Sequence, residues 1–224
     1  MDRYVLIKKL YSSEDISLIL DKASNKNESD SKVGNRVGKE KKIRKDVFFS
    51  QSESKDLDNI YFYKIQDIVK EKFKLTLKYR ETYKIGTYYG DGDEKGFYIP
   101  HTDTQGGPVH RKISVIICLS KKDNYEGGIF NFPKLKKGFK FDIGDTLIFD
   151  SNLLHGVEQV TSGKRQVLAS FMWDEEGAQI RKKNNPKINN SIYLANNNIL
   201  HTVNCNQNID IKYPKQPSIF VSIA

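Results

Sequence analysis

The side chains best suited to chemistry are two histidines, an aspartate and an arginine. His101 and Asp103 belong to a His-Thr-Asp triplet at the end of an expected strand, and His155 follows another expected strand. Such a triplet alone is a weak signal, because short motifs often match by chance. Two imidazoles and one carboxylate on one face of a metal are, however, a ligand set that suits Fe(II) and leaves three adjacent positions open. We therefore predict an Fe(II) site at His101, Asp103 and His155.

Arg165 makes this prediction more specific. 2-Oxoglutarate can fill two of the open positions through its 1-carboxylate and keto oxygen, and dioxygen can fill the third. The remote 5-carboxylate then needs a cation, and a guanidinium binds a carboxylate through two parallel hydrogen bonds. Strand parity places Arg165 on the face shared by Val167, Ala169 and Phe171. An arginine in such an apolar interior is costly unless an anion pairs with it, so we predict a cosubstrate anchor.

Taken singly, these residues also have structural explanations. Asp103 could be a turn residue, and Arg165 could be a surface cation. His110 and His201 have no acidic or histidine partner at ligand spacing, so we expect surface or core roles for them. The two cysteines, Cys118 and Cys205, are too few for a disulfide framework or a structural zinc site.

The spacing of apolar residues, which predicts the elements that position these side chains, changes along the chain from helical to strand-like. Ser12 and Ser13 can cap a helix whose apolar residues recur at helical spacing through Ala23, and a second helix is expected over 55–73. The polar stretch 25–42 between them predicts a loop. Alternation of apolar and polar residues over 77–85 predicts a strand. Further short strands are predicted over 97–103, 112–119, 129–132, 145–149, 156–160 and 166–173, with Gly127-Gly128, Lys137-Gly138, Gly144-Asp145 and Ser162-Gly163 as turns.

Helices followed by many short strands predict a mainly β protein with flanking helices, a helix-supported sandwich or jelly roll. We expect one domain over 1–181, with a helical N-terminal part, 1–75, and a β core, 76–181. Residues 182–224 form an Asn-rich C-terminal extension, which could be an appended strand or hairpin, a partner-binding segment or a partly disordered tail.

Net charge and hydropathy indicate less about function than these motifs do. The net charge of +9 comes from lysines spread along the chain, which is typical of a solvated surface, although it could also steer an anionic substrate or nucleic acid. The longest apolar run, 113–119, is too short to cross a bilayer, and no secretory leader is visible. We expect a soluble, cytoplasmic protein.

The order of the motifs over 79–175 resembles the prolyl 4-hydroxylase-like branch of the 2-oxoglutarate/Fe(II)-dependent dioxygenases. The resemblance implies a double-stranded β-helix (cupin-like jelly-roll) core, a cosubstrate anchor at Arg165, a cosubstrate hydrogen bond from Tyr83, and a need for ascorbate. The motifs that carry it are Tyr83-Lys-Ile-Gly86, His101-Thr-Asp103, Arg111-Lys-Ile-Ser-Val-Ile-Ile-Cys-Leu119, Tyr125-Glu-Gly-Gly128, Gly144-Asp-Thr-Leu-Ile-Phe149, Leu154-His-Gly-Val-Glu158 and Val160-Thr-Ser-Gly-Lys-Arg165.

This chain departs from the family pattern near the cosubstrate. An insertion over 88–96 leaves open whether Tyr83, Tyr88 or Tyr98 reaches 2-oxoglutarate. Cys118 stands where some relatives place a cosubstrate-binding tyrosine, and Ser114 of the same strand is a further candidate contact. Some relatives use lysine as the anchor, and parity favours Arg165 over the neighbouring Lys164. Arg44 and Asp46 resemble an Arg-x-Asp element near the substrate entrance of oxygen-sensing prolyl hydroxylases.

The resemblance implies hydroxylation of a substrate C–H bond, coupled to decarboxylation of 2-oxoglutarate to succinate. Ile116, Phe149 and Phe171 could form a dry wall around the reaction or could simply pack the core. Peptidyl proline in a peptide or protein is the leading substrate, and the loop 25–42 could close over it. A free amino acid or small metabolite is the alternative. We expect no membrane partner.

Two further functions fit the sequence less well. A nucleic-acid demethylase would carry its anchor arginine further beyond the distal histidine and followed by a second arginine, but no arginine follows Arg165 until Arg181. A non-catalytic jelly-roll binding module would not need the complete set of histidines, aspartate and arginine.

Overall fold

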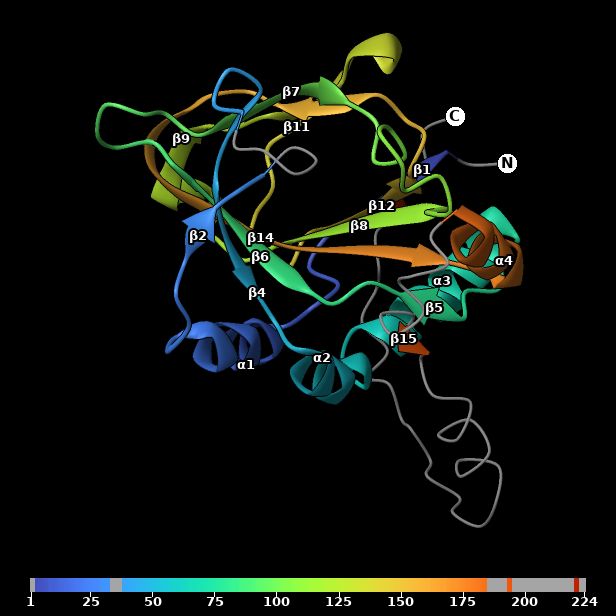
Figure 1. The fold of residues 1–224 in the computed structure, drawn as a ribbon. Coiled ribbons are helices and arrows are strands. Elements are labelled where there is room, and N and C mark those ends of the chain that lie inside the picture. Colours follow the sequence, from blue (N-terminus) through green and yellow to red (C-terminus); the bar gives the residue numbers. More distant parts are fainter. Residues whose placement is uncertain (1–2, 33–37, 185–192, 195–219, 222–224) are drawn as a thin grey trace.

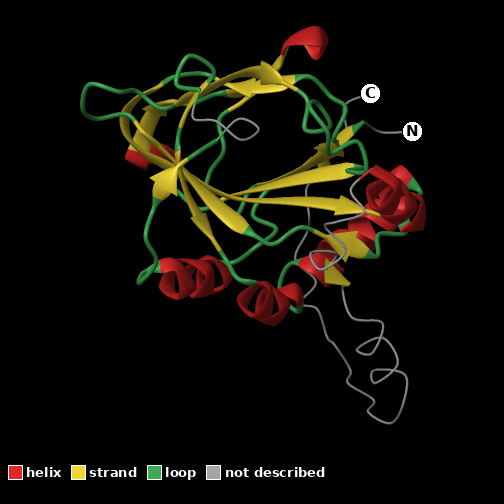
Figure 2. Cartoon of the chain, viewed as in Figure 1, coloured by secondary structure: helices red, strands yellow, loops and turns green. Residues whose placement is uncertain are grey.

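Two antiparallel sheets face each other, and three helices cover the outer face of the larger sheet (Figure 1). The computed structural model describes residues 3–32, 38–184, 193–194 and 220–221. Strands dominate this part of the chain (Figure 2), which confirms the predicted mainly β class with flanking helices. The sheets enclose a jelly-roll interior, as the resemblance implied.

The large sheet has its strands in the order β16-β1-β12-β8-β14-β6-β4-β2, with β5, β9 and β15 paired beside this path. Its strands are β1 (Tyr4–Ile7), β2 (Ser29–Asp30), β4 (Lys45–Phe48), β5 (Tyr79–Arg80), β6 (Lys84–Tyr89), β8 (Ile113–Cys118), β9 (Tyr125–Gly127), β12 (Thr146–Asp150), β14 (Val160–Trp173), β15 (Tyr193–Leu194) and β16 (Phe220–Val221). The small sheet has the order β11-β10-β13-β7-β3. Its strands are β3 (Lys42–Ile43), β7 (Phe97–His101), β10 (Phe130–Phe132), β11 (Lys137–Phe139) and β13 (His155–Val157).

Each of the first two helices begins at a capping serine. In α1 (Ser13–Ala23), the Ser12 side chain accepts from the Asp15 N–H while Asp15 bonds back, which is a complete capping box. The helix α2 (Gln51–Asp58) begins in the same way at Ser50. The remaining helices are α3 (Phe62–Phe73), α4 (Glu175–Asn184) and the 3₁₀ turns η1 (Lys122–Asn124) and η2 (Pro133–Leu135).

The single helix predicted over 55–73 is wrong, because the chain breaks between α2 and α3 at Tyr61. The Tyr61 hydroxyl donates to the Asp15 carbonyl, and the Tyr61 carbonyl accepts from the Tyr11 hydroxyl at 3.2 Å. The Tyr61 ring also packs against that of Tyr11, with centroids 4.9 Å apart. These tertiary contacts to α1 and its preceding loop fix the break, and helical periodicity carries no trace of them.

The N-terminal part, 1–75, is not purely helical. Its strand β1 pairs with β12 in the large sheet, from Tyr4 opposite Phe149 to Ile7 opposite Thr146. Within the predicted loop 25–42, Ser29–Asp30 pairs with β4 as β2, and 33–37 lie outside the described residues. Most of the extension 182–224 lies outside them too, although α4 enters it, β15 pairs with β5, and β16 pairs with β1.

Two further predicted elements differ. The strand expected over 77–85 is interrupted, because the Tyr83 N–H donates to the Ser54 hydroxyl at 3.2 Å instead of to a neighbouring strand. The turn predicted at Ser162-Gly163 lies within β14, where it pairs with β9. Gly163 adopts φ +70°, and a Cβ there would meet the Asn124 carbonyl oxygen, so glycine permits this bulge.

The structure has two main apolar clusters on opposite faces of the large sheet. One fills the space between that sheet and α1–α3, and it contains Leu57, Phe62 and Ile65. The other lies between the two sheets and contains Phe130, Phe149 and Val167. The residues predicted to bind the metal and the cosubstrate lie beside the second cluster. Within the described residues, no helix is long and apolar enough to cross a membrane.

Candidate metal and cosubstrate site

The two histidines face each other across neighbouring strands of the small sheet. His101 ends β7, and His155 begins β13 directly opposite it in the antiparallel register. Directly opposed residues have neighbouring side chains, which explains why residues far apart in sequence meet. The Asp103 N–H donates to the Ser151 carbonyl at 3.0 Å, which holds the carboxylate beside them. One ligand atom from each of His101, Asp103 and His155 lies within 4.8 Å of the others.

Both imidazoles are oriented by backbone carbonyls. His101 Nδ1 lies 2.9 Å from the Ile99 oxygen, and His155 Nδ1 lies 2.8 Å from the Leu153 oxygen. A carbonyl can only accept, so each Nδ1 carries the proton and each Nε2 keeps its lone pair. The Nε2 atoms lie 3.6 Å and 3.5 Å from the Asp103 carboxylate oxygens. This arrangement directs three lone-pair donors toward one point.

The electrostatics suit a cation at that point. Burial raises the pKa of Asp103, but His155, His101 and a hydrogen bond from Ser114 outweigh it and hold the pKa well below its usual value. Burial lowers the pKa of His155, which keeps this imidazole neutral. An ionised carboxylate and neutral imidazoles are the protonation states that a metal requires.

Aromatic rings restrict water around the ligands. The Tyr98 ring stacks on His101 with centroids 3.6 Å apart, and Phe130 stacks on His155 at 5.3 Å. Phe149 meets His155 edge-on at 4.7 Å. The predicted wall residue Phe149 therefore does border the site, and it also packs the core.

Arg165 enters the same interior without an acidic partner among the described residues. Its side chain is only 1% exposed, none of its three guanidinium nitrogens makes a hydrogen bond of good geometry there, and the Tyr125 hydroxyl lies nearby. The guanidinium carbon lies 5.2 Å from the Tyr88 ring centroid and 5.9 Å from that of Phe141. A Cβ at Gly128 would meet Arg165 Cδ at 2.8 Å, so this glycine makes room for the arginine. A buried guanidinium with unmet donors fits the remote carboxylate of a dicarboxylate.

The matched family model carries the description 2OG-Fe(II) oxygenase superfamily and covers residues 84–173. This stretch is similar to that superfamily, and it contains His101, Asp103, His155 and Arg165. Fe(II) and 2-oxoglutarate are the metal and cosubstrate of the superfamily, and the three ligands and the unpaired arginine fit both.

The curated relatives that match part of this chain are named as hydroxylases. A PKHD-type hydroxylase of Colwellia psychrerythraea is 31% identical over 90 residues, which are 39% of this chain and 38% of the relative. One from Shewanella oneidensis is 33% identical over 89 residues, which are 38% of this chain and 39% of the relative. The matches thus span well under half of these relatives' length.

Solved structures share the fold at low identity. The viral collagen prolyl hydroxylase of Paramecium Bursaria Chlorella virus-1 has a TM-score of 0.58 at 17% identity, over 77% of this chain and 97% of that chain. A Pseudomonas putida prolyl-4-hydroxylase has a TM-score of 0.63 at 11% identity, over 78% and 94%. A Trichoplax adhaerens prolyl hydroxylase, solved with a peptide fragment of hypoxia inducible factor, has a TM-score of 0.62 at 17% identity, over 80% and 87%.

The structure separates the three tyrosines that the sequence offers as cosubstrate contacts. Tyr83 points into the helix-side cluster, where its hydroxyl donates to Asp58 at 3.0 Å, so the expected cosubstrate contact of Tyr83 does not fit. Leu77, Tyr83 and Ile85 all lie in this cluster, so the predicted alternation is kept and places Tyr83 on the face away from Arg165. Tyr88 instead lies opposite Arg165 in the β6–β14 register, and Tyr98 stacks on a metal ligand.

Ser114 and Cys118 lie on the strand β8 but have different surroundings. The Ser114 hydroxyl donates to Asp103 Oδ2 at 2.7 Å and lies 2.9 Å from the Ser151 hydroxyl. It therefore supports a metal ligand. Cys118 is buried, and its thiol donates to the Ser120 carbonyl at 3.2 Å. Burial raises the pKa of Cys118 despite the nearby Arg165 cation, so this thiol stays neutral beside the anchor.

Arg44 and Asp46 form a buried ion pair beside Tyr88. Arg44 Nε lies 2.7 Å from Asp46 Oδ1, and Arg44 Nη1 donates to the Tyr88 hydroxyl at 3.2 Å. The pair belongs to residues 42–48, named the strap here, which run from β3 in the small sheet to β4 in the large one. A Cβ at Gly86 would meet Arg44 Cδ and Nε at 2.9 Å, so the glycine of the Tyr-x-x-Gly motif lets the strap lie close.

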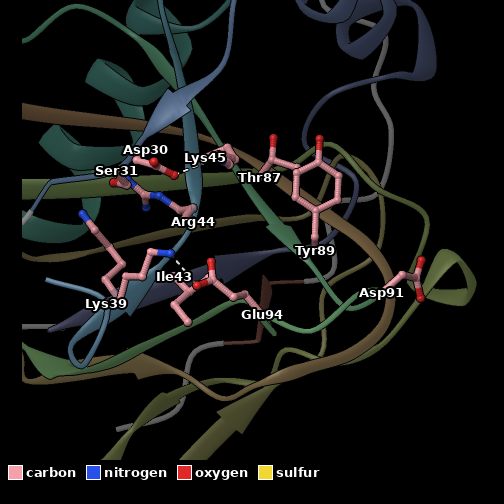
Figure 3. A pocket seen from close by; sticks show the side chains of 11 residues that line it. Asp30, Ser31, Lys39, Ile43, Arg44, Lys45, Thr87, Tyr89, Asp91 and Glu94 are labelled. Carbon is pink, nitrogen blue, oxygen red and sulfur yellow. Dashed lines mark hydrogen bonds and ion pairs between the residues drawn. The ribbon is translucent and has the colours of Figure 1, made fainter. Parts of the chain in front are cut away.

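A pocket of about 280 Å³ lies beside the strap (Figure 3). Its rim is charged, with Lys45 paired to Asp30 and Lys39 paired to Glu94. Arg44 also lines this pocket, so the ion pair expected at the substrate entrance borders both the interior and the surface.

Arg111 is a residue of the site that the sequence did not indicate as one. Arg111 donates from Nη1 to the Asp103 carbonyl at 3.0 Å, and it binds Glu81 through Nε and Nη2 at 2.6 Å and 2.8 Å. Arg111 lies in a family-like motif, but nothing in its sequence neighbourhood indicates contact with a metal ligand. Lys164 is exposed, which agrees with the parity that favours Arg165.

The remaining histidines carry no ligand role in the described residues. His110 is buried, accepts from Arg181 at 2.8 Å, and meets the Trp173 ring edge-on at 4.8 Å. The expected core role of His110 is thus confirmed. His201 and Cys205 lie outside the described residues.

Proposed function

We propose that this chain is a 2-oxoglutarate- and Fe(II)-dependent dioxygenase that hydroxylates a substrate C–H bond, with peptidyl proline as the leading substrate. The observation that carries the proposal is the buried, unpaired Arg165 beside the cluster of His101, Asp103 and His155. A metal site alone would allow many functions, whereas the unmet guanidinium calls for a second carboxylate.

The chain's residues have distinct roles in this reaction. His101, Asp103 and His155 would hold the metal, and Arg165 would bind the 5-carboxylate of the cosubstrate. Bound iron and 2-oxoglutarate supply the activation of dioxygen, with release of succinate and carbon dioxide. Tyr88, opposite the anchor, would border the cosubstrate, and Ser114 would fix the carboxylate of Asp103. Reduction of oxidised iron by ascorbate remains part of the proposal.

The substrate class is supported by the names of the relatives. The curated relatives are PKHD-type hydroxylases, and a Trichoplax relative is a prolyl hydroxylase solved with a peptide. A free amino acid or small metabolite is the second candidate. Nucleic-acid demethylation is less well supported, because no arginine follows Arg165 in the sequence until Arg181. A purely binding function leaves the unpaired Arg165 unexplained.

The proposal is tested by Fe(II)-dependent formation of succinate from 2-oxoglutarate, measured with proline-containing peptides, free amino acids and methylated oligonucleotides. We expect turnover that a peptide stimulates, and its loss in Asp103→Asn. The exposed Asp123→Asn is the matched control, because it removes the same charge far from the ligands. The proposal would be contradicted if the native protein formed no succinate, or if Asp103→Asn formed as much succinate as the native protein.

A further inference from the structure

Lys84 is a lysine inside the jelly roll that the proposed reaction does not use. It begins β6 and lies directly opposite Ala169 of β14. Directly opposite residues project from the same face of a sheet, and Ala169 shares its face with Arg165. The Lys84 side chain therefore leaves the large sheet on the side of the metal ligands.

A short series of contacts connects Lys84 to the metal site. Its Nζ lies 5.0 Å from the centroid of the Phe171 ring, and the guanidinium carbon of Arg111 lies 3.8 Å from the same centroid. Arg111 in turn donates to the carbonyl of the ligand Asp103 at 3.0 Å. Phe171, expected from the sequence as part of a dry wall, thus contacts two cations through its ring. One is Arg111, which bonds to Asp103, and the other is Lys84, at the start of β6.

The acidic groups nearest to Lys84, Asp46 and Glu81, are each already paired with an arginine. Arg111 has Glu81, and Arg44 has Asp46. Within the described part of the chain, Lys84 has neither a hydrogen bond nor an ion pair. The side chain is half-buried, and burial, followed by the nearby Arg44, lowers the pKa of Lys84 to about 8. The ammonium is still mostly charged at neutral pH, and an unpaired ammonium that has lost part of its water is stabilised by an incoming carboxylate.

An exposed aromatic side chain lies next to this ammonium. Phe48 of β4 is directly opposite Lys84 in the register, so both project from the same face. Phe48 is 55% exposed, although it is a large apolar residue. Lys84 is thus placed between Phe48 at the rim and Phe171 inside, where a ligand with a carboxylate and an apolar part would find both partners.

We propose that Lys84 is a specificity-determining residue that binds a carboxylate of the substrate next to the carbon that is hydroxylated. This inference rests on the proposed function and narrows its substrate to an acidic one. The carboxylate can belong to an acidic side chain beside a peptidyl proline or to a free amino acid. Both sources offer Lys84 the same charge-assisted hydrogen bond.

A binding experiment tests the inference without turnover. Labelled peptides Gly-Pro-Glu-Gly and Gly-Pro-Gln-Gly, both with blocked ends, are titrated by fluorescence anisotropy. The protein carries Fe(II) and an unreactive 2-oxoglutarate analogue under argon. Free L-proline and L-prolinamide are added as unlabelled competitors. We expect one acidic probe to bind about 10-fold more tightly than its amide, as one hydrogen bond to a charged group provides.

Variants assign the effect to Lys84. Lys84→Met keeps the length of the side chain, removes the charge, and is expected to abolish the preference for the acidic probe. Lys84→Glu is expected to favour a Gly-Pro-Lys-Gly probe instead. Lys134→Met is the matched control, because Lys134 is exposed on η2 and makes no hydrogen bond or ion pair with the described residues. It should leave the preference unchanged.

The outcomes separate the inference from the proposed function. Equal binding of acidic and amide probes by the native protein, no binding of either acidic probe, or a preference that persists in Lys84→Met would overturn the role of Lys84. Succinate formation is measured in parallel with the same probes. If turnover is absent while the Lys84-dependent preference remains, the proposed reaction fails and the carboxylate site stands.

Discussion

At the scale of single residues, the buried charge of Arg165 has opposite effects on the empty and the loaded protein. Without a ligand, the guanidinium loses water and gains no acceptor, which destabilises the folded state. A bound dicarboxylate reverses this cost. The same side chain should therefore lower the stability of the free protein and raise that of the complex.

Arg165→Met should raise the thermal midpoint of the protein without 2-oxoglutarate, because it replaces an unpaired charge by an apolar side chain of similar length. Saturating 2-oxoglutarate should stabilise the native protein by about 2.7 kcal/mol at a concentration 100 times its Kd, and should leave the variant unchanged. Thermal unfolding with and without 2-oxoglutarate, in the presence of Fe(II) under argon, measures both effects.

The neighbouring Lys164→Met is the matched control, since Lys164 is exposed on the same strand. This variant should retain the full ligand-induced shift. A shift of native size in Arg165→Met would show that the cosubstrate is bound by another cation.

At the scale of elements, the strap of residues 42–48 depends on a glycine in the strand beneath it. Gly86→Ala places a methyl group 2.9 Å from Arg44, and such overpacking costs about 1–3 kcal/mol. We expect a lower midpoint in urea unfolding. We also expect a higher KM for 2-oxoglutarate, because Arg44 bonds to Tyr88 opposite the anchor.

A double-mutant cycle isolates this contact. In an Arg44→Ala/Asp46→Ala background, both members of the ion pair are absent and the added methyl group has room. Gly86→Ala should then have little effect on stability. An equal loss in both backgrounds would place its cause in the strand and not in the strap.

The helix α4 is held by a hydrogen bond from its Arg181 to His110, which can accept that bond only while it is neutral. Burial, and then the Arg181 cation, lowers the pKa of His110 to about 4 from its ordinary 6.5. Between these two pH values the unfolded chain binds a proton that the folded chain does not, so stability falls as the pH is lowered from about 6.5 to about 4. Protonation also removes the acceptor for Arg181, a residue of α4.

His110→Gln keeps a hydrogen-bond acceptor but cannot take up this proton. Urea unfolding at a series of pH values should therefore show a shallower loss of stability between pH 6.5 and pH 4 than in the native protein. The difference in slope corresponds to at most one proton. Parallel pH profiles for the two proteins would mean that other groups cause the acid sensitivity.

At the scale of the whole molecule, we propose that residues 1–181 form the oxygenase domain and that 182–224 are an extension. The three residues predicted to bind the metal, and Arg165, precede the extension. Removal of 185–224 should leave Fe(II) affinity unchanged. It should also promote self-association, because β1 loses its partner β16 and exposes an open strand edge.

Metal titration and analytical ultracentrifugation of the truncated and full chains test this division. A truncated chain that is folded, binds Fe(II) and associates more strongly agrees with it. Loss of cooperative unfolding or of metal binding would show that the extension belongs to the domain.

The parts of the site that could be predicted follow from local rules. Expected strand ends and ligand chemistry were enough to predict the set of His101, Asp103 and His155. The alternation of residues along β14 was enough to predict that Arg165 points into the interior. Tyr83 does not fit the role that the resemblance implied, because its backbone bonds to Ser54 of α2 and its side chain lies in the helix-side cluster. No pattern near Tyr83 shows this bond.

Other features depend on how separate elements pack. Lys84 and Arg111 meet on opposite sides of one phenylalanine only after β6, β8 and β14 are assembled. The break between α2 and α3 similarly requires contacts of Tyr61 with α1. The helix α4 was not anticipated, since its sequence lacks a clear apolar period.

The strap sets a limit on how the two sheets can move. Only Arg44 separates Ile43, in the small sheet, from Lys45, in the large sheet. Consecutive Cα atoms are ~3.8 Å apart, so these two residues are at most ~7.6 Å apart. Sheets packed face to face are usually ~10 Å apart. The interior is therefore narrower along this edge. The sheets can move apart only by rotating about the strap as a hinge, and not by a parallel separation.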